Sequence, residues 1–81
     1  MNKAAFNVHF GKFVEHKRKQ NEWTQLDLAS RLGNNFQNIS RMERGLINPT
    51  LYWLMSLSAA FGLSMTELIS EFEQSLNKDN V

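Results

Sequence analysis

The chain has 81 residues, a net charge of +1 and no cysteine, and this length suits one domain over residues 1–81. The absence of cysteine excludes a disulfide framework, a thiolate metal site and cysteine-based catalysis. The first residues lack the apolar run of a signal peptide, and no segment has the apolar length needed to cross a bilayer. We therefore expect a cytoplasmic protein without a membrane partner.

The small net charge hides an uneven distribution along the chain. Residues 1–50 carry a net charge of +4, and residues 51–81 carry a net charge of −3. A basic N-terminal part and an acidic C-terminal part favour binding to a polyanion in one orientation. The alternative is that these charges simply solvate exposed helix faces.

Five helices are predicted, because strand-like alternation is scarce and the helix-breaking Gly and Pro residues fall where helices should end. The first helix is expected to begin near Phe6 or Phe10 and to end at Gln20. The second begins after Thr24, which can cap it together with Asp27, and it stops at Gly33. The fold class is therefore all-α, a compact five-helix bundle.

The remaining three helices have equally clear boundary signals. The third is capped by Asn35 and ends at Gly45. The fourth begins near Asn48–Thr50, with either Asn48 or Thr50 as its cap, and ends at Gly62. The fifth begins at Ser64, where Glu67 three residues later completes a capping box.

The third helix has two contrasting faces. At about 100° per residue, Gln37, Arg41 and Arg44 form one stripe, while Ile39 and Met42 lie on the opposite side. Arg suits the two acceptors of guanine, and Gln or Asn suits adenine, so this stripe matches base edges in the major groove. An ordinary solvated helix face is the alternative. Glu43 falls towards the interior, where it requires a cationic partner.

The order of these residues resembles that of the lambda-repressor-like helix-turn-helix family, of the Cro/CI or xenobiotic-response-element type. The similarity extends from about Phe10 to Ile69, with the helix-turn-helix at about residues 24–45. It rests on the segments Thr24-Gln25, Leu28-Ala29, Leu32-Gly33, Ile39–Gly45, Asn48–Thr50 and Phe61–Ser64. The resemblance implies a DNA-binding transcription regulator that is not an enzyme and needs no cofactor.

The resemblance also implies roles for individual residues. The expected base-reading residues are Phe36, Gln37, Asn38 and Arg41. The expected contacts to the DNA backbone are Gln25, Asn35, Ser40, Arg44, Asn48 and Thr50. Arg18 matches the arginine that pairs with the buried glutamate, here Glu43. Phe36 is left open, since it either touches a thymine methyl or folds back onto the protein.

Two positions depart from the family pattern. Asn34 stands where the turn prefers Val or Ile, so the bend is either less well packed or holds an unusual backbone conformation. Lys17 stands where Leu is common, so its methylene stem is expected to cover the core.

The fourth and fifth helices carry more apolar residues than one core needs. Leu51, Leu54, Leu57 and Phe61 are expected to face inward. The surplus, predicted to form a dimer interface within about residues 49–77, is Tyr52, Trp53, Met55, Ala59, Phe72 and Leu76. The alternative is that this surplus packs against the N-terminal segment, including Phe6. A homodimer would require a palindromic double-stranded operator with half-sites about 10 base pairs apart.

Several biological roles fit such a protein. They are a phage-type switch, an antitoxin that represses its own operon, and a controller protein of a restriction–modification system, which is most similar in length. A protein-interaction adaptor with the same fold is the competing class. No phosphate-binding loop or nucleophile–base pair is present, and His9 and His16 lack further ligands for a metal. Glu67, Glu71 and Glu73 either contact RNA polymerase or aid solubility.

Overall fold

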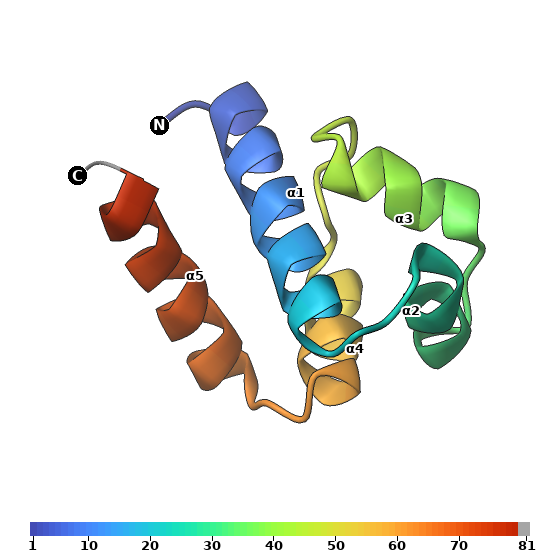
Figure 1. The fold of residues 1–81 in the computed structure, drawn as a ribbon. Helices are drawn as coiled ribbons and strands as arrows, with labels where there is room; N and C mark the ends of the chain where they lie inside the picture. Colours follow the sequence, from blue (N-terminus) through green and yellow to red (C-terminus); the bar gives the residue numbers. More distant parts are fainter. Residues whose placement is uncertain (80–81) are drawn as a thin grey trace.

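The computed structural model describes residues 1–79, which form five helices and no strand (Figure 1). The helices are α1 (Lys3–Gln20), α2 (Gln25–Leu32), α3 (Phe36–Glu43), α4 (Leu51–Ala60) and α5 (Met65–Asp79). The predicted all-α, five-helix fold is therefore confirmed. The first helix begins earlier than predicted, because the Asn2 side chain accepts a hydrogen bond from the Ala5 amide at 2.8 Å and caps it.

The long helix α1 lies at the centre of the molecule (Figure 1). It packs against α3 on one side and against α5 on the other, while α2 packs on both α3 and α4. The helix-turn-helix pair of α2 and α3 thus lies on the opposite side of α1 from the C-terminal helix α5.

Side-chain caps define where the later helices begin, as the sequence predicts. Thr24 and Asp27 form a complete capping box, and Ser64 and Glu67 form another at the start of α5. The Thr50 hydroxyl accepts a hydrogen bond from the Trp53 amide at 3.1 Å, so Thr50, and not Asn48, caps α4. These local hydrogen bonds supply acceptors for amides that have no partner within the helix.

The core lies where all five helices meet. Its least exposed side chains are Phe10, Val14, Leu28, Ala29, Ile39, Met42, Leu57 and Leu68. The Phe72 ring lies edge-on to the rings of Phe6, Phe10 and Phe13, with centroid distances of 5.2–5.5 Å. Such edge-to-face packing of aromatic rings is favourable beyond simple burial.

This cluster corrects part of the expectation for the surplus apolar residues. Phe72 is only 5% exposed, and Leu76 and Trp53 are partly buried against the same core. For Phe72 the predicted place in a dimer interface is wrong, and the alternative is observed, since the residue packs against Phe6 in the N-terminal part of α1. Leu51 is also placed wrongly by the helical pattern, since it is 67% exposed instead of facing inward.

The two departures from the family pattern have local explanations. Lys17 lies with its ammonium group 5.8 Å from the Phe61 ring centroid and 2.6 Å from Glu71 Oε1, so its stem does cover the core. The Asn34 side-chain oxygen accepts hydrogen bonds from the Asn35 amide and from Asn38 Nδ2. Among the described residues other than glycine, a positive φ occurs at Glu22 alone, so Asn34 is not in an unusual backbone conformation.

Candidate nucleic-acid interface

The outer face of α3 carries the polar side chains that the sequence singled out. Gln37, Arg41 and Arg44 are exposed, whereas Ile39 and Met42 are almost completely buried. The predicted orientation of this helix is therefore confirmed. Its apolar side holds it against α1 and α2, and its polar side faces solvent.

The donors of this polar stripe differ in how they are held. Gln37 and Arg41 make no side-chain hydrogen bond within residues 1–79. Arg44 Nε donates to the Ser40 carbonyl at 3.4 Å, a long and weak contact on the surface. Ser40 itself is half-buried. Most of the amide and guanidinium donors on the stripe are thus available to a ligand.

Two asparagines at the start of α3 are engaged within the protein. The Asn35 side chain accepts a hydrogen bond from the Asn38 amide and caps the helix. Asn38 is half-buried, and its Nδ2 donates to Asn34 Oδ1 at 2.9 Å. The predicted roles of Asn35 and Asn38 in DNA contact therefore fall on side chains that already stabilise the turn.

The side-chain amide of Gln25 points into the protein, towards Glu43. The predicted partner of this residue is a DNA phosphate, but its Nε2 donates to Glu43 Oε1 at 3.0 Å. What the N-terminus of α2 still offers to an anion is its backbone and the positive end of the helix dipole. A side-chain contact from Gln25 would require that bond to Glu43 to break.

The predicted Arg18–Glu43 ion pair lies directly beneath α3. Arg18 Nε donates to Glu43 Oε2 at 2.7 Å and Nη2 donates to Oε1 at 3.0 Å, while Nη1 donates to the Trp23 carbonyl at 2.8 Å. The hydrogen bond to Glu43 is the main reason that the pKa of Arg18 is raised above its ordinary value. Arg18 thus donates to both oxygens of the Glu43 carboxylate, and Gln25 adds a further hydrogen bond to Oε1.

Three further residues predicted to contact DNA, Phe36, Asn48 and Thr50, differ in how exposed and how hydrogen-bonded they are. Phe36 is 47% exposed and is not among the core residues, and its contact with a thymine methyl stays a prediction. Asn48 Nδ2 donates to Asn7 Oδ1 at 2.8 Å. Thr50 uses its hydroxyl to cap α4. No local pattern predicts the Asn7–Asn48 contact, because the two residues are 41 positions apart.

The described residues contain no group of three or more histidine, cysteine or acidic side chains placed to hold a metal ion. No helix within the described part of the chain is both long and apolar enough to cross a membrane.

Comparison with known proteins decides the family. A model of the helix-turn-helix family matches residues 14–68. The chain belongs to the helix-turn-helix family. It is a DNA-binding transcription regulator of the xenobiotic-response-element type and not an enzyme, as the resemblance implied.

A relative and two solved structures support this placement. An uncharacterised HTH-type transcriptional regulator, y4dJ of Sinorhizobium fredii, is 35% identical over 57 residues, which are 70% of this chain and 74% of the relative. The restriction–modification controller protein C.AhdI from Aeromonas hydrophila is 28% identical, with a TM-score of 0.73 over 79% of this chain and 97% of that one. The clp gene regulator ClgR from Corynebacterium glutamicum shares the fold at 22% identity, with a TM-score of 0.79 over 91% of this chain and 79% of that one.

Proposed function

We propose that this helix-turn-helix regulator binds a palindromic operator as a homodimer and reads it with α3 in the major groove. The observation that carries the proposal is the outer stripe of α3, where Gln37, Arg41 and Arg44 are exposed on a helix whose other side is fixed in the core. A rigid helix that projects guanidinium and amide groups fits the width and the donor–acceptor pattern of the major groove.

The side chains of the stripe divide into two roles. Gln37 and Arg41 read base edges, because they are exposed and form no hydrogen bond within residues 1–79. Phe36 lies beside them and can contact a thymine methyl. Arg44 lies at the C-terminal end of α3 and contacts phosphate, together with the segment from Asn48 to Thr50.

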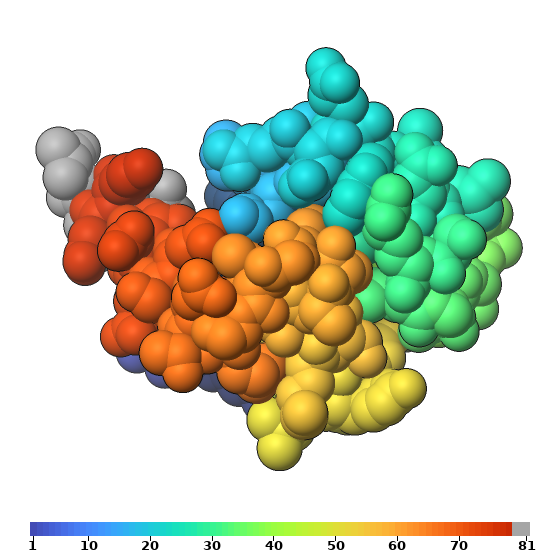
Figure 2. All heavy atoms as spheres, turned by 90° about the horizontal axis from the view of Figure 1, so that it is seen from below, coloured from blue at the N-terminus to red at the C-terminus, as the bar shows by residue number. Residues whose placement is uncertain are grey.

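The homodimer is supported by apolar surface on α4. Tyr52 is 70% exposed, Leu51 67% and Met55 55%, and Ala59 is exposed further along the same helix. Figure 2 shows α4, in yellow to orange, on the surface of the molecule between α5 and the helix-turn-helix. Large apolar patches of this kind mark interaction sites, and an isologous contact would use the same residues on both copies.

Ile69 on α5 is a further exposed apolar residue. It is 36% exposed, whereas Leu68 beside it in the sequence is fully buried. The interface that we propose is therefore formed by α4 with the outer side of α5. Phe72 lies in the core, and Leu76 and Trp53 pack against it, so these three residues are not part of the interface that we propose.

The role that fits best is a small autoregulator of the controller-protein kind, acting in the cytoplasm on its own operon. The support is the likeness to C.AhdI, which extends over 97% of that chain and is named as a restriction–modification controller protein. A protein-interaction adaptor would use the same fold but would leave the α3 stripe without a ligand, whereas an antitoxin that represses its own operon would use the stripe in the same way. A contact between RNA polymerase and Glu67, Glu71 and Glu73 stays a prediction.

Fluorescence anisotropy tests the proposal directly. The labelled probe is a palindromic fragment from upstream of the protein's own gene, and a scrambled duplex of the same length is the control. We expect tighter binding to the palindrome and a logarithm of affinity that falls linearly with the logarithm of salt concentration. The absence of detectable binding at low salt would favour the adaptor.

A further inference from the structure

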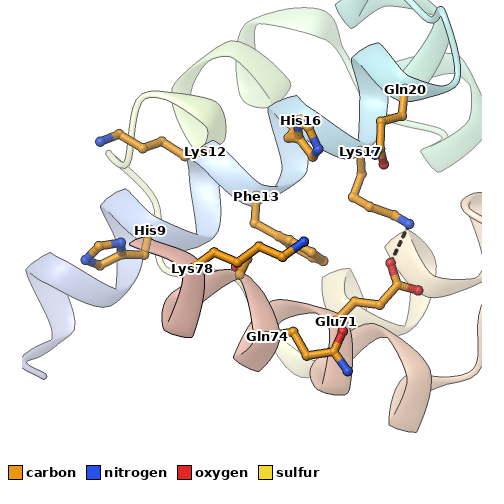
Figure 3. A pocket seen from close by; sticks show the side chains of 10 residues that line it. His9, Lys12, Phe13, His16, Lys17, Gln20, Glu71, Gln74 and Lys78 are labelled. Atoms are coloured by element: carbon orange, nitrogen blue, oxygen red, sulfur yellow. Dashed lines mark hydrogen bonds and ion pairs between the residues drawn. The ribbon is translucent and has the colours of Figure 1, made fainter. Parts of the chain in front are cut away.

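A groove between α1 and α5 is not used by the proposed DNA contacts (Figure 3). Its volume is about 410 Å³, within the range of sites that hold small molecules. Phe13, which is only 6% exposed, is the one apolar residue among the described residues that line it. The walls are polar and come from both helices, which means that one ligand could contact α1 and α5 together.

The groove carries a net positive charge, although α5, which forms one of its walls, is rich in acidic residues. Lys12, Lys17 and Lys78 line it with one carboxylate, Glu71. Elsewhere on α5, Glu67 and Glu73 are acidic. Lys12 and Lys17 belong to α1 and Lys78 to α5, so both helices contribute positive charge to the groove.

Among residues 1–78, carboxylates neutralise only part of this positive charge. Lys17 Nζ lies 2.6 Å from Glu71 Oε1, but no carboxylate among residues 1–78 lies within ion-pair distance of Lys12 or Lys78. Figure 3 shows the Lys78 side chain extending from α5 along the groove, which Phe13 also lines. His16 and Gln74 point into the same space from opposite walls and add hydrogen-bonding groups.

The groove remains accessible when the two proposed surfaces are occupied. It faces away from α3, because α1 separates α3 from α5 (Figure 1). On α5 it uses Glu71, Gln74 and Lys78, whereas Ile69 belongs to the other side of that helix. A ligand in the groove would therefore compete with neither the operator nor a second copy of the chain.

We infer that this groove binds a small molecule with at least two negative charges, carried on phosphate or carboxylate groups. The ammonium groups of Lys78 and Lys17 form charge-assisted hydrogen bonds with the anion, and Gln74 donates from its amide. An anion at this position competes with Glu71 for Lys17, which links the site to the Lys17 contact with Phe61 on the α4–α5 side of the core. This inference does not depend on operator binding.

Titration of the full-length, ¹⁵N-labelled protein followed by NMR tests the inference. The probes are pyrophosphate and citrate, each compared with sodium chloride at matched ionic strength, and they distinguish phosphate from carboxylate as the preferred group. We expect saturable shifts for amides of α1 and α5 beside the groove and none along α3. Shifts that sodium chloride reproduces would overturn the inference, because they would reflect screening alone.

Two variants with the same loss of charge make the test specific. Lys78→Gln removes an ammonium group that no described carboxylate holds, so it should weaken binding about tenfold while the fold persists. Lys19→Gln removes the ammonium group of an α1 lysine that lies outside the groove, is 63% exposed and pairs with Glu15. This control should change the affinity by less than about twofold. Equal losses in the two variants would contradict the site. Saturable binding of hexaglutamate without binding of either small anion would overturn it in favour of an acidic peptide.

Discussion

Arg18 and Glu43, which are 25 residues apart in the sequence, are joined by two hydrogen bonds of 2.7 and 3.0 Å. Their side chains are only 9% and 2% exposed. The pair fixes the last turn of α3 to α1 and thereby sets the position of the helix that faces the DNA. Gln25 adds a third bond to the same carboxylate from the start of α2.

Removal of the buried carboxylate should destabilise the fold. Glu43→Ala leaves the Arg18 guanidinium buried without its anion, which should cost about 3 kcal/mol of the free energy of unfolding. Urea denaturation followed by circular dichroism measures this loss. Arg44→Ala, one position further along and exposed, is the matched control and should change stability by less than about 0.5 kcal/mol. An unchanged midpoint for Glu43→Ala would mean that the pair does not hold the fold.

Arg41 and Arg44 should differ in what their removal does to DNA binding. Arg41→Ala should cost about 1–3 kcal/mol on the preferred operator and relax the preference at particular base pairs. Arg44→Ala should weaken binding to all sequences alike and reduce the salt slope by about one. Anisotropy with the operator and with single-base variants measures both. If Arg41→Ala lost affinity equally on every sequence, the division of roles would be incorrect.

A charge on the apolar surface of α4 should separate dimerisation from folding. Met55 is 55% exposed, so Met55→Glu should leave the monomer folded but shift the association equilibrium towards monomer and weaken operator binding. Sedimentation velocity over a concentration series measures the change. Ser30→Glu, at an exposed position of α2, adds the same charge and should leave association unaltered. A wild-type protein that stays monomeric at all concentrations would rule out the interface.

Gly11 should not tolerate a side chain, although it lies within a helix. A Cβ at this position would lie 2.4 Å from the Met42 carbonyl oxygen and 2.7 Å from that of Glu43. Gly-to-Ala changes inside a helix usually stabilise by about 1 kcal/mol, but Gly11→Ala should instead destabilise by about 1–3 kcal/mol because α1 and α3 must move apart. Thermal denaturation gives the sign. Ser70→Ala on the exposed side of α5 serves as the control and should be neutral or slightly stabilising.

The two capping boxes should make stability depend on acid. Hydrogen bonds from the backbone amides of Thr24 and Ser64 lower the pKa of Asp27 and Glu67 below their ordinary values. A carboxyl group whose pKa is lower in the folded state contributes stability above its unfolded pKa, and that contribution is lost as the pH falls through the folded pKa. The melting temperature should therefore decline between about pH 5 and about pH 3.

Amide replacements isolate the contribution of the boxes. Asp27→Asn and Glu67→Gln keep an oxygen that can accept the capping hydrogen bond but cannot titrate. The double variant should show a smaller decline in melting temperature over the same pH range. An equal decline in both proteins would assign the acid sensitivity to other carboxylates.

The features that the sequence predicted correctly are mostly local. The caps at Thr24, Asn35 and Ser64, and the two-sided character of α3, depend on residues within one or two turns of each other, so spacing alone is informative. The Arg18–Glu43 pair is a long-range contact, and it was predicted because an inward carboxylate on α3 required a cation and the family resemblance supplied one.

The features that were missed depend on packing between distant segments. For Phe72, apolar spacing left both a dimer interface and packing against the N-terminal segment open, and only the contact with Phe6 on an early turn of α1 decides between them. Gln25 points towards Glu43 instead of solvent because α2 and α3 converge on the same ion pair. Leu51 shows a further limit, since apolar spacing along α4 fits more than one rotation of that helix about its axis.

The indole of Trp23 lies between the Arg31 guanidinium, 4.0 Å from its centroid, and the Phe61 ring, 5.8 Å away and nearly parallel. The backbone carbonyl of the same residue receives a hydrogen bond from Arg18. The protein therefore carries an intrinsic optical reporter at the junction of α1 and α2. Of its two tryptophans, Trp53 can be replaced by phenylalanine, and the emission wavelength of the remaining indole would then follow the loosening of this junction in real time.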